Sequence, residues 1–250
     1  MKDISYKDFI PPIVLRLFRK LAIRFLKTND QNHIIVTQNL KHKYKCYSQY
    51  HEDLIIDSLM QCKDNGFYID IGANDPIELS NTARFYQRGW SGINIEPNPE
   101  LYRRLAESRK RDINLNIGIG EKETELTFYN VSAHTLSSFN KQAAIRAAKE
   151  FHEHLVGEQK IKIQPLRHIF AAYTGGREVD FMSVDAEGYD YIVLKSNDWQ
   201  KFRPKIVMVE MNKDYDNINK LLNCLDYELF FYNQTNGIFI DKNTDISAPK

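Results

Sequence analysis

Residues 67–75 read FYIDIGAND, and this stretch decides the fold. Its apolar beginning, residues 67–71, predicts a buried strand that ends in a tight turn before a helix. Gly72 would let the backbone pass close to a ligand at the carboxyl end of that strand. A dinucleotide fingerprint needs Gly-x-Gly-x-x-Gly, and only one of those glycines is present. Because Asp75 would repel a pyrophosphate, the stretch favours a cofactor without phosphate that carries an ammonium and a sulfonium group.

A second acid follows at the end of the next predicted strand, residues 91–95, where the chain continues with Glu96. An acid at this position can accept hydrogen bonds from both hydroxyls of a ribose. Asp70 or Glu96 alone would be an ordinary polar residue at a strand end. The two acids in this order, with one helix between them, indicate a cofactor that contains a ribose.

The chain from residue 66 onward alternates short apolar runs with longer amphipathic stretches, which predicts a parallel sheet with helices on both faces. Two strand-like runs near the C-terminus are separated by only four polar residues, so they must form an antiparallel hairpin. A charged stretch, residues 140–160, is interpreted as helical and would either cap the acceptor site or lie solvated on the surface. The expected strands are 67–71, 91–95, 113–117, 180–184, 205–209, 227–232 and 237–241, and the expected helices are 52–62, 81–88, 99–108 and 189–197.

The overall charge is close to neutral, with 34 Lys and Arg residues against 33 Asp and Glu residues. We expect no nucleic-acid partner, because this composition provides no bulk basic field. Cys46, Cys62 and Cys224 are odd in number and fit neither a zinc site nor a disulfide framework, so free thiols in a reducing cytosol are predicted. No stretch approaches the ~20 apolar residues of a membrane helix, and the N-terminus lacks the order of a signal peptide. These features predict a cytoplasmic location.

The N-terminal region differs from the rest of the chain. Residues 11–27 form a predicted cationic amphipathic helix, followed by a polar linker. Its basic face would contact either an anionic membrane at the inner face or a partner protein, or would simply be solvated. We therefore divide the chain into residues 1–45, a helix and linker, and residues 46–250, one domain. No feature of the sequence indicates an oligomeric state.

Five sequence blocks together resemble the FkbM family of methyltransferases, over about residues 46 to 243. They are SQYHED (48–53), DIGAN (70–74), GWSG (89–92), EPNP (96–99) and DAEGYD (185–190). The resemblance implies a Rossmann-like α/β fold of class I, with a mostly parallel seven-stranded sheet that ends in an antiparallel hairpin. It also implies S-adenosylmethionine as donor and transfer to an oxygen, often on a sugar or a secondary metabolite. Arg167 departs from the family pattern, which usually has an aspartate there.

The resemblance also implies which residues hold the donor. The methionine part of the donor would be lined by Asp70, Gly72, Ala73 and Asn74, and its ribose would be held by Glu96. Its adenosine would lie near Asn98, and its adenine near Asn116, Ile117 and Gly118. Two residues from the SQYHED block, Gln49 and Asp53, would close over the donor.

The predicted chemistry requires an acceptor about 3 Å from the methyl group and a base or metal to take the hydroxyl proton. Asp185 and Glu210 end two strands whose carboxyl ends should lie side by side. With Asn212 they would form an oxygen site for Mg²⁺ or another divalent cation, similar to metal-dependent catechol and macrolide-sugar methyltransferases. Without a metal, Asp185 would face the donor's amino group, and Glu210 would orient the substrate or act as base.

His134, in the polar stretch SAHTLSS (132–138), is a further candidate base, with a hydrogen-bonded loop histidine as its alternative. The function expected from these residues is O-methylation of a hydroxyl on a sugar, a glycan or a glycosylated metabolite. The alternative is a non-catalytic module that binds S-adenosylmethionine in polysaccharide assembly. The acids Asp185, Glu187 and Glu210 favour the enzyme, because a scaffold has no need of them. The missing glycines argue against a nicotinamide oxidoreductase.

Overall fold

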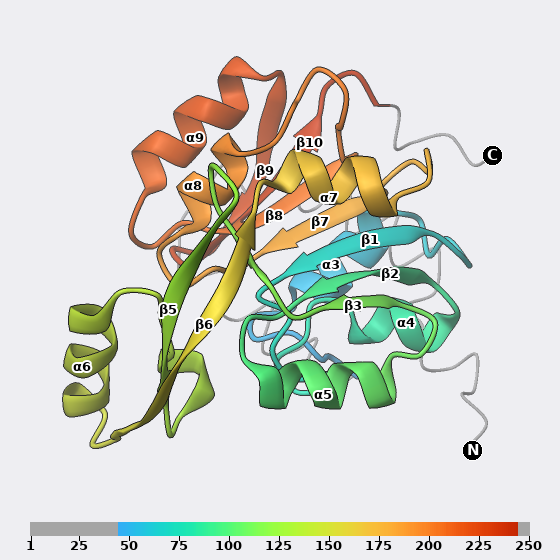
Figure 1. Cartoon of the computed structure of the whole chain (residues 1–250). Coiled ribbons are helices and arrows are strands. Elements are labelled where there is room, and N and C mark those ends of the chain that lie inside the picture. The colour runs from blue at the N-terminus through green and yellow to red at the C-terminus, as the bar shows by residue number, and fades with distance from the viewer. Residues whose placement is uncertain (1–44, 245–250) are drawn as a thin grey trace.

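A computed structural model describes residues 45–244 of the 250-residue chain. Its main sheet has seven strands in the order β3-β2-β1-β7-β8-β10-β9, and β10 runs antiparallel to both of its neighbours (Figure 1). This arrangement confirms the predicted class I methyltransferase fold. The strands are β1 (Phe67–Ile71), β2 (Ser91–Ile95), β3 (Ile113–Leu115), β7 (Phe181–Val184), β8 (Ile206–Glu210), β9 (Tyr227–Tyr232) and β10 (Asn236–Asp241).

The register of the sheet brings the carboxyl ends of four strands into one row. Ile71 of β1 pairs with Ile95 of β2 and with Val184 of β7, and Val184 pairs in turn with Val209 of β8. The residues that follow these partners are Gly72, Glu96, Asp185 and Glu210, so they stand level at one edge of the sheet. Parallel pairing without a slip therefore assembles the candidate site from four distant segments.

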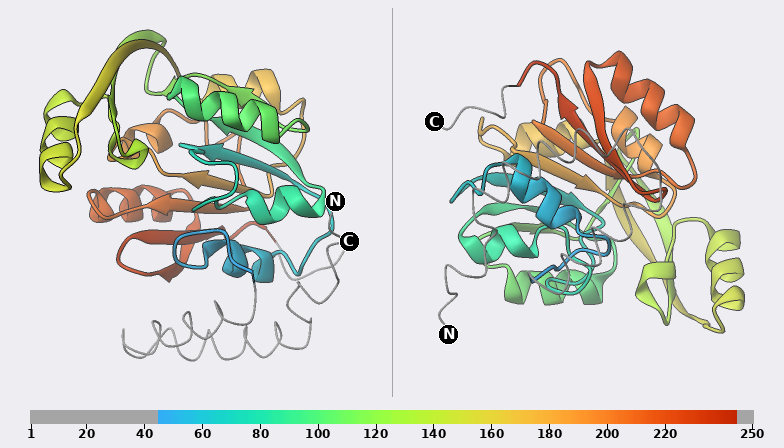
Figure 2. Two further views of the ribbon diagram at one scale, coloured as in Figure 1. Left: turned by 90° about the horizontal axis from the view of Figure 1, so that it is seen from below. Right: turned by 180° about the vertical axis from the view of Figure 1, so that it is seen from behind.

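Helices cover both faces of the main sheet. Every residue of β1 is buried, because its alternate side chains face two different hydrophobic clusters. One cluster contains side chains from α7, α8 and α9, and the other contains side chains from α3 and α4. Figure 2 shows α3 and α4 on one side of the sheet and α7 on the other. The helices are α3 (Glu52–Leu59), α4 (Ala83–Arg88), α5 (Pro99–Ser108), α7 (Leu166–Tyr173), α8 (Asp190–Lys195) and α9 (Tyr215–Cys224).

A second sheet forms an arm between β3 and α7. It has the order β4-β6-β5, with β4 (Gly118–Ile119), β5 (Thr124–Val131) and β6 (Leu155–Gln164). Figure 1 shows β5 and β6 leading away from the main sheet to α6 (Lys141–Glu150). The helix predicted over residues 140–160 is therefore wrong in its second half. Antiparallel pairing with β5 makes residues 155–160 a strand. Just beyond them, Ile161 and Ile163 turn inward onto Phe128 while Lys162 between them faces solvent.

The other predicted elements agree with the structure to within a few residues, and β1, β2, α5 and β9 have the predicted bounds. Within residues 45–244, Cys46, Cys62 and Cys224 form no disulfide, in agreement with the prediction. No helix within residues 45–244 combines the length and apolar character that a membrane span requires. The helix expected over residues 11–27 lies outside the described residues.

Candidate active site

A cleft lies along the carboxyl edge of the main sheet and encloses about 1120 Å³ of space, part of it open to solvent. The register of the sheet accounts for its position. Ten of the residues predicted for the site line it: Gln49, Asp70, Gly72, Ala73, Asn74, Glu96, Ile117, Gly118, His134 and Asp185. The lining does not include five other predicted residues, which are Asp53, Asn98, Asn116, Glu210 and Asn212.

Glu96 is buried at the end of β2, and backbone groups orient both of its oxygens. Its carboxylate accepts hydrogen bonds from the backbone N–H groups of Asn74 at 2.9 Å and Asn98 at 2.8 Å. Each oxygen keeps a further lone pair, so the side chain can still accept two hydroxyl protons. Burial raises the pKa of Glu96 to about 7.

Asp70 and Gly72 line the cleft at the end of β1. The buried Asp70 carboxylate accepts a hydrogen bond from the Thr82 hydroxyl at 2.7 Å, and burial raises its pKa above the usual value. Gly72 has a φ of 78°, and a Cβ added there would lie 1.8 Å from the carbonyl oxygen of Asp185. The glycine is therefore required by contact between two strand ends, in addition to any approach of a ligand.

Four carboxylates gather where β7 and β8 end. Oxygen atoms of Asp185, Asp190 and Glu210 lie within 4.8 Å of one another. Burial, and then the negative charge of Glu210, raise the pKa of Asp185 well above its usual range. Burial also raises the pKa values of Asp190 and Glu210, and that of Glu187 to about 7. Asp190 was not among the predicted site residues, although it lies within the DAEGYD block. Its carboxylate accepts hydrogen bonds from the N–H groups of Ala186 and Gly188.

The two carboxylate oxygens of Glu210 differ in their hydrogen bonding. Oε1 accepts a hydrogen bond from the Asn212 side chain at 2.8 Å. Oε2 is buried and has no hydrogen-bond partner among the described residues. An unsatisfied buried carboxylate oxygen is costly unless a ligand, a water or a proton completes it. Asn212 itself is exposed, so it stands at the outer side of the cluster.

The arm contributes the remaining wall of the cleft through Thr135, Ser137, Ser138 and Phe139. His134 begins the short 3-10 helix η2 (His134–Leu136), and its Nδ1 lies 3.4 Å from the side-chain nitrogen of Asn98. Because Asn98 also donates its backbone N–H to Glu96, this contact places the histidine on the Glu96 side of the cleft.

Three predicted donor residues hold loops. The Asp53 carboxylate is buried and accepts hydrogen bonds from Ser48 and from the N–H of Tyr47. Asn98 caps α5 through the N–H groups at its first turn, and Asn116 donates to the carbonyl oxygens that follow β2. Each therefore shapes a segment that borders the cleft.

Comparison with known proteins gives one family. The chain matches the family model described as "Methyltransferase FkbM domain" over residues 70–230. No curated protein sequence matches it.

Several solved structures are similar to the chain. One is a TehB-like SAM-dependent methyltransferase from Corynebacterium glutamicum, at 9% identity over 86% of this chain and 100% of that chain, with a TM-score of 0.42. Another is the fibrillarin pre-rRNA processing protein of Methanococcus jannaschii, at 12% identity over 72% of this chain and 68% of that chain, with a TM-score of 0.41. A methyltransferase from Geobacter sulfurreducens is 12% identical over 93% of this chain and 99% of that chain, with a TM-score of 0.36.

Proposed function

Because the chain belongs to the FkbM methyltransferase family and is an S-adenosylmethionine-dependent methyltransferase, we propose that it methylates a hydroxyl of an uncharged sugar ring, in a glycan or a glycosylated metabolite. The observation that carries this proposal is the charge of the cleft. Of the described residues, Asp70, Glu96, Asp185 and Glu187 line it, and no lysine or arginine does.

This charge favours the donor and opposes an anionic acceptor. S-adenosylmethionine carries a sulfonium and an ammonium group, which carboxylates attract. A phosphate or carboxylate on the reacting ring would face like charges in a half-buried cleft, with no arginine fork to pair it. Lys213, beside Gly188, offsets part of the negative charge on Glu187, but it does not line the cleft.

The arm supplies groups that suit a sugar. Ser137 and Ser138 accept hydrogen bonds through their hydroxyl oxygens from the N–H groups of Val131 and Asn140. Each hydroxyl therefore keeps its own proton to donate to an acceptor. Phe139 and Tyr189, whose ring centroids lie 5.9 Å apart, add an apolar surface to the same wall.

The proposed reaction is an in-line displacement. The acceptor oxygen bonds to the donor methyl carbon, the carbon–sulfur bond breaks, and the sulfonium becomes a neutral thioether. Without a bound cation, the hydroxyl proton passes to Asp185 or Glu210, because burial, and then repulsion between the clustered carboxylates, raises their pKa values and so their basicity. His134 remains a candidate base that would act from the ribose side.

Methyl transfer to matched glycosides tests the acceptor class. We expect methylation of neutral methyl hexosides, and a kcat/KM at least about tenfold lower for the uronate of the same ring, since one like-charge contact costs about 1.4 kcal/mol or more. The uronamide is the control, because it restores neutrality at the same position. A uronate that reacts as well as the neutral glycoside and the amide would contradict the proposal.

We further propose that a divalent cation such as Mg²⁺ binds the carboxylates of Asp185, Asp190 and Glu210. Their convergence within 4.8 Å and the unpartnered Oε2 of Glu210 support this, because hard cations take carboxylate ligands. This ligand set contains Asp190 in place of the predicted ligand Asn212, whose side chain donates a hydrogen bond to Glu210. A bound cation would supply Lewis-acid lowering of the acceptor hydroxyl's pKa.

Metal removal tests this second proposal. We expect EDTA to abolish methyl transfer and Mg²⁺ to restore it. We also expect Mn²⁺ to raise the melting temperature of the wild type but not of Asp190→Asn. The control is Asp198→Asn, at a partly exposed acid outside this cluster. Full activity in EDTA together with an unchanged melting temperature in Mn²⁺ would exclude the cation and favour a carboxylate base.

A further inference from the structure

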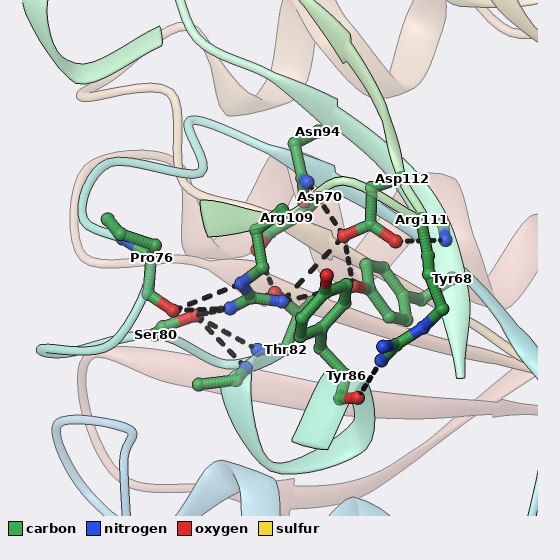
Figure 3. A network of polar contacts seen from close by, with 12 residues as sticks. Tyr68, Asp70, Pro76, Ser80, Thr82, Tyr86, Asn94, Arg109, Arg111 and Asp112 are labelled. Atoms are coloured by element: carbon green, nitrogen blue, oxygen red, sulfur yellow. Dashed lines mark hydrogen bonds and ion pairs between the residues drawn. The ribbon is translucent and has the colours of Figure 1, made fainter. Parts of the chain in front are cut away.

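A buried arginine lies behind the donor side of the cleft, outside its lining. Arg109 follows the last turn of α5 and is 2% exposed. Its Nε and Nη2 donate to the carbonyl oxygen of Pro76 at 3.1 and 2.6 Å, and Nη2 also donates to the Ser80 hydroxyl at 3.2 Å. Figure 3 shows the guanidinium group reaching these two residues of the loop that follows β1.

That loop, residues 74–81, forms much of the donor side of the cleft. Asn74, Leu79, Ser80 and Asn81 all line it. Asn74 and Leu79 have φ values of 51° and 55°, a left-handed conformation that costs free energy in residues other than glycine. Because local preference opposes this shape, tertiary contacts must hold it. The two hydrogen bonds to Pro76 are contacts of this kind.

The other end of the guanidinium group is fixed as well. Its Nη1 donates to the Tyr68 hydroxyl at 3.0 Å and lies 3.8 Å from Oδ2 of Asp112. Asp112 in turn accepts hydrogen bonds from Tyr68, from the N–H of Gly92 and from Asn94. Figure 3 shows this acid with Tyr68 and Asn94 beside Arg109. The arginine is therefore rigid and its charge is compensated, as a buried cation requires.

A short chain of contacts leads from Arg109 to the site acid Asp70. The Ser80 oxygen that accepts from Arg109 lies 3.4 Å from the Thr82 hydroxyl, and Thr82 donates to Asp70 at 2.7 Å. The positive charge of Arg109 also lowers the pKa of Asp70 against the effect of burial. The negative charge of Asp112 opposes this effect, and Asp70 itself raises the pKa values of Glu96 and Asp185.

We propose that Arg109 is a positioning residue for the methyl donor: it fixes loop 74–81 and, through Ser80 and Thr82, orients the Asp70 carboxylate without touching the donor itself. The inference rests on the donor site proposed above. It predicts that donor affinity depends on residues that do not line the cleft.

Titration calorimetry with S-adenosylhomocysteine tests the proposal in the full chain. We expect Arg109→Lys to raise the Kd about 100-fold, because the single Nζ of a lysine cannot replace donors that reach Pro76 and Ser80 on one side and the Tyr68 hydroxyl on the other. We expect Ser80→Ala to raise the Kd about tenfold. Arg111→Lys is the matched control, since the exposed Arg111 lies two residues away and contacts the carbonyl oxygen and the ring of Tyr86. Unchanged affinity in Arg109→Lys and Ser80→Ala, or an equal loss in Arg111→Lys, would overturn the proposal.

Thr82→Val tests the link to Asp70 through the pH dependence of donor binding, which a merely structural role would not change. Without the Thr82 hydrogen bond the pKa of Asp70 rises further, so S-adenosylmethionine affinity should fall at neutral pH and recover at higher pH. A Kd that changes equally at all pH values would contradict the link to Asp70. If the wild type binds neither ligand, the proposed donor site itself fails; if it binds both and the variants match it, only the positioning role fails.

Discussion

Replacing Gly72 with alanine is expected to abolish detectable binding of S-adenosylhomocysteine and to destabilise the protein by about 4 kcal/mol or more. The added Cβ would lie 1.8 Å from the carbonyl oxygen of Asp185, a backbone atom that cannot rotate away. The strands β1 and β7 would have to separate at the cleft, since the N–H of Asp185 donates to the carbonyl oxygen of Ile71 directly beside the contact. Calorimetric titration and the melting temperature measure the two effects.

Gly176→Ala separates this collision from backbone strain. Gly176 has a φ of 77°, almost the same as the 78° of Gly72, but an added Cβ would meet no atom within 4 Å. We expect this control to lose only the ~1–2 kcal/mol of a left-handed non-glycine residue and to bind the donor normally. If Gly72→Ala and Gly176→Ala lost similar amounts of stability and donor affinity, backbone conformation alone would explain the requirement for Gly72, and the close approach of the strand ends would not.

Glu96→Gln should raise the Kd for S-adenosylhomocysteine about 100-fold at pH 8, which corresponds to about 2.7 kcal/mol. The carboxylate is proposed to accept both ribose hydroxyls, and hydrogen bonds to a charged group are the stronger kind. In the variant the amide nitrogen would also face a backbone N–H, that of Asn74 or Asn98, with two donors opposed. Glu100→Gln, on the exposed side of α5, is the control and should bind normally.

The same residue predicts how donor binding depends on pH. Burial raises the pKa of Glu96 to about 7, so the free protein holds a proton there below that pH. Because only the ionised carboxylate accepts both ribose hydroxyls, the affinity for S-adenosylhomocysteine should be constant above pH 7. It should fall about tenfold for each pH unit below pH 7. The Glu96→Gln variant should lack the step near pH 7. A step that persists in this variant would assign the titration to another group.

Local patterns were sufficient to predict the main sheet and the residues at its edge. The apolar runs at 67–71 and 91–95 can only be buried strands once amphipathic helices separate them, and parallel pairing then brings Asp70, Glu96 and Asp185 to one edge. The family followed from the same blocks, and the match over residues 70–230 confirms it. These features depend on neighbours within a few residues, which is why the sequence alone contains them.

The remaining features depend on contacts between distant residues, which leave no local pattern. Residues 155–164 are charged enough to suit a solvated helix, and only pairing with β5 across the arm makes them a strand. Arg109 reads as a surface residue after a helix, yet it meets Pro76 and Tyr68, 33 and 41 positions away. Asp190 joins Asp185 and Glu210 only because β7 and β8 are neighbours in the sheet. The sequence by itself determined the main sheet and the residues at its donor edge. Only tertiary packing decided which polar side chains support that edge, because these side chains meet their hydrogen-bond partners only after the strands have paired.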